Sequence, residues 1–121
     1  MNWFTARIIY RIVTGKGEHA PQFDEQLRLI RARDKASAFE KASRLGHKEQ
    51  DSFSNHKGET VEWRFVGVAE LTHLGTLTDG AELTSSITEP TDAHLYTRYV
   101  HERQHAIGAG FLSLNMRSID N

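Results

Sequence analysis

Residues 3–13 alternate between two sets of side chains, and this alternation constrains the fold more than any other feature of the sequence. One set is apolar: Phe4, Ala6, Ile8, Tyr10 and Ile12. The intervening set is mixed: Thr5, Arg7, Ile9 and Arg11. A period of two places each set on one face of a β-strand, and the β-branched and aromatic residues favour a strand with one buried face. A half-buried strand is therefore expected here.

The rest of the chain predicts an α+β fold in the order ββαββα, with an antiparallel sheet of about four strands and the helices packed on one face. The expected strands are 3–13, 23–33, 60–72 and a short extended segment at 81–87. The expected helices are 35–53, begun by Asp34 as N-cap, and 92–106.

Three irregularities in this pattern carry structural predictions. The buried parity of the second strand switches after Leu29 to Ile30 and Ala32, which indicates a bulge or burial on both faces. Gly46 either weakens the first helix or allows it to approach the sheet closely. Gly67 interrupts the apolar face of the strand at 60–72, which indicates a bulge or a crossing by the helix.

The composition narrows the class of protein. The chain has 121 residues and no cysteine, which fits one domain, 1–121, in which residues 108–121 form a loosely patterned C-terminal tail. Without cysteine there is no disulfide framework, zinc finger or cysteine nucleophile. No apolar run approaches the roughly 20 residues of a membrane span, and no signal peptide is visible at the start. A soluble, cytoplasmic protein with no membrane association is therefore expected.

The charges are distributed unevenly along the chain. Residues 1–48 hold ten Lys/Arg and five Asp/Glu, whereas residues 49–121 hold five and eleven. A basic patch is predicted on the first two strands, at Arg7, Arg11, Arg28 and Arg31. Nucleic-acid binding through such a patch needs aromatic side chains on the same face, and Tyr10 has the opposite parity to Arg7 and Arg11. Weak nucleic-acid binding is therefore kept only as a second alternative.

One catalytic-looking motif occurs, at His101-Glu102-Arg103-Gln104-His105. In H-E-x-x-H on a helix, both imidazoles bind one zinc ion and the glutamate acts as general base. Here Phe111 stands where the extended motif places its third ligand, and only Asp120 follows as a carboxylate. One alternative is a zinc hydrolase, with His101 and His105 as ligands and Glu102 as base. The others are a solvated helix face that also carries His94, or adventitious metal binding by the histidine pair without catalysis.

No other catalytic residue or cofactor is predicted, and the leading hypothesis is a non-enzymatic binding or accessory module. Leu, Ile, Val and Phe make up 28 of the 121 residues, so the core is thin. A sheet face or edge is therefore expected to bind a partner protein or a second copy of the chain. The expected binding surface comprises Trp63, Phe65, Asp79 and Glu82.

Five short segments also follow one another in a recognisable order. They are residues 3–7 (WFTAR), 23–32 (FDEQLRLIRA), 38–42 (AFEKA), 61–68 (VEWRFVGV) and 79–83 (DGAEL). Together they resemble DUF4288, a small bacterial family of unknown function, over about residues 2–88. The resemblance implies no established activity, cofactor or catalytic residue. The family often continues with an aromatic residue, Ser and Arg, where this chain has Thr84, Ser85 and Ser86. The H-E-x-x-H motif lies outside the matching region.

Overall fold

A computed structural model describes the backbone of residues 1–119 and the side chains of residues 1–112. Its elements follow the order ββαββα, which confirms the α+β class. They are β1 (Asn2–Thr14), β2 (Gln22–Ala32), α1 (Lys35–Lys48), β3 (Asp51–Ser54), β4 (Thr60–His73) and α2 (Ala93–Ile119). The chain divides into two compact units, Met1–Ser85 and Ser86–Asn121, and each is described by itself. The single domain expected over 1–121 stays a prediction.

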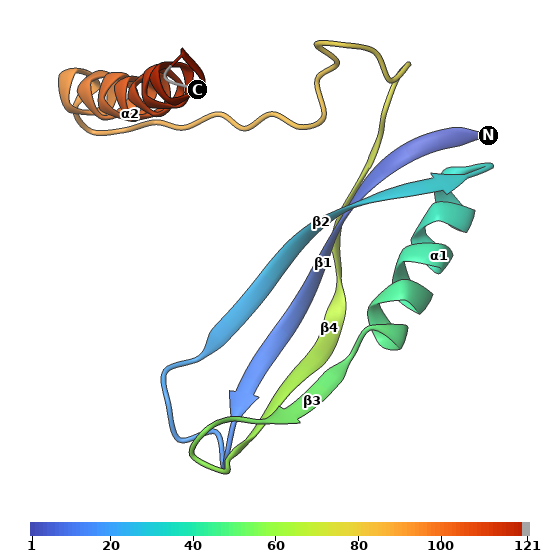
Figure 1. Ribbon diagram of the computed structural model, residues 1–121. Coiled ribbons are helices and arrows are strands. Elements are labelled where there is room, and N and C mark those ends of the chain that lie inside the picture. Colours follow the sequence, from blue (N-terminus) through green and yellow to red (C-terminus); the bar gives the residue numbers. More distant parts are fainter. Residues whose placement is uncertain (120–121) are drawn as a thin grey trace. The chain divides into compact units, whose positions relative to one another are not determined.

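The first unit contains one antiparallel sheet of four strands in the order β2-β1-β4-β3 (Figure 1). β1 and β2 pair without a register shift, from Asn2 opposite Ala32 to Ile12 opposite Gln22. The parity switch in β2 is therefore not a bulge, and the expected burial on both faces is wrong as well, because Leu27 and Leu29 are exposed. Ile30 lies in the core, whereas Leu27 and Leu29 point to the other side of the sheet.

β4 is less regular than β2. Its register with β1 shifts twice, once between Arg7 and Ile8 and once between Ile9 and Tyr10. Gly67 lies between the two shifts, opposite Ile9, so the bulge predicted at this interruption is confirmed. Each extra residue reverses the alternation of the strand. The two shifts thereby keep Phe65, Val68 and Leu71 all packed against the same core.

α1 covers one face of the sheet. Asp34 is its N-cap, as predicted, and accepts a hydrogen bond from the Ser37 N–H at 2.8 Å. The buried residues of the helix, Ala38, Ala42 and Gly46, recur every fourth position and form one stripe. That stripe faces the core residues Phe4, Ala6, Ile8, Tyr10, Ile30 and Ala32.

Gly46 allows α1 to approach the sheet closely. A Cβ atom at this position would overlap the ring of Phe65 on β4. The Tyr10 hydroxyl, which is buried, donates a hydrogen bond to the Gly46 carbonyl at 2.9 Å. The second of the two expectations for Gly46 is therefore the correct one, because any side chain there would separate helix and sheet.

Two predicted helix ends and one predicted strand are wrong. α1 ends at Lys48 instead of residue 53, and β3 follows it and pairs with Thr60–Trp63. Residues 81–87, all of which the structure describes, form no strand. A short alternating stretch becomes a strand only where a neighbour supplies hydrogen bonds, which the alternation itself does not reveal. α2 continues past residue 106 to Ile119, so the segment expected as a loose tail from residue 108 is helical as far as Ile119.

Candidate binding surface

The two faces of the sheet differ in what covers them within the first unit. Residues opposite one another in an antiparallel pair point to the same face. One face carries the core and α1. We call the other the open face. It consists of Trp3, Thr5, Arg7, Ile9 and Arg11 of β1, Phe23, Glu25, Leu27, Leu29 and Arg31 of β2, and Arg64, Gly67, Glu70 and Thr72 of β4.

Exposed apolar side chains gather along β2 on the open face. Phe23, Leu27 and Leu29 are 53%, 42% and 52% exposed. They follow one parity of a single strand, with exposed Glu25 between Phe23 and Leu27. We call these three residues the β2 strip. These three residues were not among the predicted binding residues, although the parity switch in β2 was a signal that both of its faces carry apolar residues.

Several charged side chains on the open face have local partners. Arg7 on β1 forms an ion pair with Glu70 on β4, with Nε and Oε2 3.3 Å apart. The Arg31 guanidinium lies over the Trp3 ring, 5.6 Å from its centroid. Arg64 pairs with Glu62 at 2.7 Å. The open face is therefore a mixed surface of both charge signs beside an apolar strip.

The predicted basic patch is divided between the two faces. Arg7, Arg11 and Arg31 lie on the open face, whereas Arg28 lies on the side that α1 covers. The Arg28 guanidinium donates two hydrogen bonds to the Glu49 carboxylate, at 2.6 and 3.0 Å. These bonds raise the pKa of Arg28 and lower the pKa of Glu49. Arg28 thus ties β2 to the end of α1.

The aromatic residues of the expected binding surface lie on the helix-covered side of β4. Trp63 is half-buried, donates from Nε1 to Asp24 Oδ2 at 3.2 Å and stacks on Phe53. Phe65 is half-buried and packs against the His47 ring at a centroid distance of 4.6 Å. Both rings therefore have packing partners within the fold, and a role of these rings in binding stays a prediction.

The two acidic residues expected in the same surface lie elsewhere in the first unit. Asp79 and Glu82 are exposed and belong to the segment after β4, on either side of a turn at Gly80. The Ala81 N–H closes this turn by donating to the Thr78 carbonyl at 3.0 Å. A role of Asp79 and Glu82 in binding likewise stays a prediction.

The H-E-x-x-H residues His101, Glu102 and His105 lie on α2 and are exposed. The two histidines are one helical turn apart, and Glu102 lies 3.9 Å from Arg98, an i,i+4 ion pair. Within the described part of the chain, no cluster of three or more His, Asp and Glu side chains is arranged to hold a metal ion. The histidine pair thus supplies two ligands, whereas a catalytic zinc site takes three from the protein.

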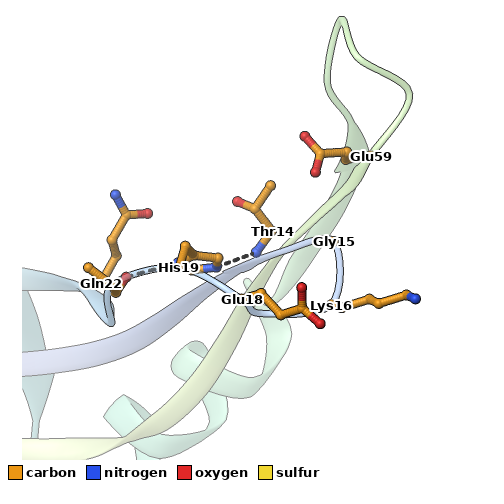
Figure 2. A pocket seen from close by; sticks show the side chains of 8 residues that line it. Thr14, Gly15, Lys16, Glu18, His19, Gln22 and Glu59 are labelled. Atoms are coloured by element: carbon orange, nitrogen blue, oxygen red, sulfur yellow. Dashed lines mark hydrogen bonds between the residues drawn. The ribbon is translucent and has the colours of Figure 1, made fainter.

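A hollow of about 910 Å³ lies beside the turn between β1 and β2 (Figure 2). Figure 2 shows His19 bonded back to Thr14, whose backbone N–H donates to His19 Nε2 at 3.0 Å. Because Nε2 accepts, Nδ1 carries the proton and donates to the Ala20 carbonyl at 2.8 Å. Both ring nitrogens are thus used inside the turn, so His19 closes the turn and has no nitrogen left for a ligand.

A family model described as a domain of unknown function (DUF4288) matches residues 3–85. The chain belongs to this family. The DUF4288 match covers β1 except for Asn2, and all of β2, α1, β3 and β4, and it ends where the first compact unit ends, at Ser85. α2 with its H-E-x-x-H motif lies outside the matched residues. Comparison with curated proteins and with solved structures finds no match for the chain.

One further finding concerns the helices. None of those in the described residues is both long and apolar enough to cross a membrane.

Proposed function

We propose that the unit Met1–Ser85 is a non-enzymatic protein-binding module, and that it binds through the open face at the β2 strip. The observation that carries the proposal is the exposure of Phe23, Leu27 and Leu29 on one face of a single strand, with Leu27 next to Leu29 on that face. Isolated exposed apolar residues are ordinary, whereas a contiguous apolar patch rimmed by charges is typical of a protein interface.

The neighbouring charges favour a protein partner over a nucleic acid. Arg7 and Arg64 already form ion pairs with carboxylates. A nucleic-acid phosphate would have to displace these carboxylates before it could bind either arginine, and their negative charge would repel it. Tyr10, the aromatic residue between Arg7 and Arg11 in sequence, lies buried on the opposite face. Mixed charges around an apolar strip are instead suited to another protein surface, where each charge meets its opposite.

The test is a photo-activated cross-linking residue placed at Leu29 of the full chain in its own cells. Phe39 on α1 is the matched control, because it is also 52% exposed but belongs to the helix that packs on the opposite face of the sheet. We expect a product of defined mass from position 29 that excess unmodified chain competes away, and no such product from position 39. Equal products from both positions, or none from position 29, would contradict the proposal.

The zinc-hydrolase alternative is tested separately. Zinc bound to the full chain at one ion per chain, and lost in His101→Ala, would support it. Zinc content unchanged by that substitution would remove its basis.

A further inference from the structure

We infer that the protein bound at the β2 strip is a second copy of this chain, joined edge to edge by antiparallel pairing of the two β2 strands across a two-fold axis. The inference rests on the proposed function and names its partner. The two four-stranded sheets would then form one continuous sheet, with the β2 strips of both copies side by side at its centre.

β2 is suited to this pairing because its outer edge is long and regular. It is the outermost strand on its side of the sheet, and its eleven residues pair with β1 without a shift. The outward N–H and C=O groups of such a strand form a template for another strand. A strand of the same chain that runs antiparallel matches this template in length and twist.

The sequence of β2 is self-complementary in one register. When Arg28 lies opposite itself, Leu27 lies opposite Leu29 of the second copy, and Glu25 lies opposite Arg31 of the second copy. Two-fold symmetry repeats each pair, so the open face gains a cluster of four leucines flanked by two ion pairs. All four positions are exposed within the first unit. Cross-strand apolar and opposite-charge pairs of this kind stabilise a sheet.

The neighbouring registers lose this match. A shift by one residue would bring the open face of one copy onto the helix side of the other. Moving the centre to Leu27 places Glu25 opposite Leu29, and moving it to Leu29 places Leu27 opposite Arg31. The register centred on Arg28 is therefore the one that pairs leucine with leucine and acid with base.

Two features oppose the pairing, and both are small. Arg28 meets its own copy, but each guanidinium is already held by two bonds to Glu49. Lys41 donates from Nζ to the Arg31 carbonyl at 2.9 Å and so occupies one acceptor near the end of the edge. Lys41 is an exposed side chain that regains hydration when displaced.

The first experiment is sedimentation equilibrium of the full chain and its charge variants. Glu25→Arg alone and Arg31→Glu alone each place like charges opposite one another twice, so dimer affinity should fall about tenfold or more. The double variant Glu25→Arg/Arg31→Glu restores opposite charges and should recover the dimer. Glu40→Arg, a reversal at an exposed position on α1, is the matched control and should leave the affinity unchanged. Lys41→Ala should strengthen the dimer slightly.

The second experiment determines the register by disulfide cross-linking. The chain has no native cysteine, so each introduced cysteine can pair only with its copy in the second chain. Residues opposite one another in antiparallel strands have Cα atoms about 4.5–5.5 Å apart, within the range that a disulfide spans. On mild oxidation, Arg28→Cys should form a dimer faster than Leu27→Cys or Leu29→Cys. Circular dichroism confirms that each variant is folded.

Failure of this inference can be told apart from failure of the proposed function. A dimer affinity that neither charge reversal changes would overturn the β2 pairing. Cross-linking that is fastest from a position other than 28 would overturn it too. A strict monomer would also overturn it. If the Leu29 cross-linker still captures another protein, which the unmodified chain competes away, the open face binds that protein instead. If it captures nothing, both proposals fail.

Discussion

β2 and β4 flank the same central strand, yet they differ in regularity and in how their outer edges are protected. β2 pairs with β1 residue for residue, whereas β4 shifts register twice within four residues of β1. The outer side of β4 is paired with β3 over Thr60–Trp63, and beyond it the Phe65 N–H donates to Gln50 Oε1 at 2.9 Å. β2 has Lys41 on its Arg31 carbonyl as the corresponding contact.

The difference indicates how each strand avoids or permits pairing with another chain. Bulges bend a strand and spoil its edge as a template, and a side chain that bonds an edge amide removes one more site of attachment. β4 has both the bulges and the bonded edge amide, and both lie next to Phe65, where α1 approaches the sheet at Gly46. β2 pairs with β1 without a register shift and carries exposed leucines. Both features favour pairing of its outer edge with a strand of another chain.

The largest expected effect on stability is at the contact between α1 and β4. Gly46→Ala should destabilise the first unit by about 1–3 kcal/mol in urea unfolding, although alanine favours a helix by about 1 kcal/mol. The reason is that the new Cβ overlaps the Phe65 ring and moves α1 off the sheet.

Gly67→Ala on β4 is the matched control, because a Cβ there would meet open space. It should change the free energy of unfolding little. Combining Gly46→Ala with Phe65→Leu should cost less than the two single changes together, since they share one contact. A Gly46→Ala variant as stable as the native chain would contradict the close contact between α1 and β4.

A smaller loss is expected at Tyr10, which ties α1 to the central strand. Tyr10→Phe removes the hydrogen bond to the Gly46 carbonyl and should cost about 0.5–1.5 kcal/mol. Burial, and to a lesser degree the charge of Glu49, raises the pKa of the Tyr10 hydroxyl. The resulting stability is complete below the ordinary tyrosine value of about 10 and is lost as the pH rises through the folded-state pKa.

Urea unfolding at several pH values checks both parts. In Tyr10→Phe the alkaline loss of stability should be smaller than in the native chain, while the difference between the two proteins is constant near neutrality. An alkaline limb of the same steepness in both would show that the Tyr10 hydroxyl is not buried on folding.

The smallest expected effect is at Glu49, which joins β2 to the end of α1. Glu49→Gln should cost a few tenths of a kcal/mol, because the pair with Arg28 is partly exposed. The hydrogen bond from Arg28 lowers the pKa of Glu49, so its stabilisation is present above the ordinary glutamate value of about 4.3 and is lost as the pH falls through the folded-state pKa.

Acid unfolding of the two proteins is the measurement. The native chain should be the more stable one near neutrality, and the difference should disappear at low pH. A difference that persists below the glutamate range would mean that Glu49 acts through packing and not through its charge.

Local sequence patterns predicted most of the sheet, but little of its candidate binding surface. The alternation around Ile8 and Tyr10 was sufficient to predict β1, and Asp34 to predict the start of α1. Gly67 indicated either a bulge in β4 or a crossing by the helix, and the register with β1 shows the bulge. β3 was missed because four residues carry too little pattern, and its pairing with Thr60–Trp63 is a tertiary property.

The candidate surface was harder to predict, since alternation does not say which face a helix will cover. Trp63 and Phe65 were chosen as binding residues because they are large and aromatic, but they pack on the side of α1. Leu27 and Leu29 were taken as part of an apolar strand, and only the pairing with β1 shows that they point away from the core.

Concentration-dependent hydrogen exchange tests the contrast between the two edges most directly. The full chain is compared at a low and a high concentration, and the exchange rate of each backbone amide in β2 and β4 is measured. The account predicts that outward amides between Phe23 and Arg31 exchange more slowly at high concentration, while residues 66–72 of β4 are unchanged. Slowing confined to β4, or no slowing in either strand, would contradict it.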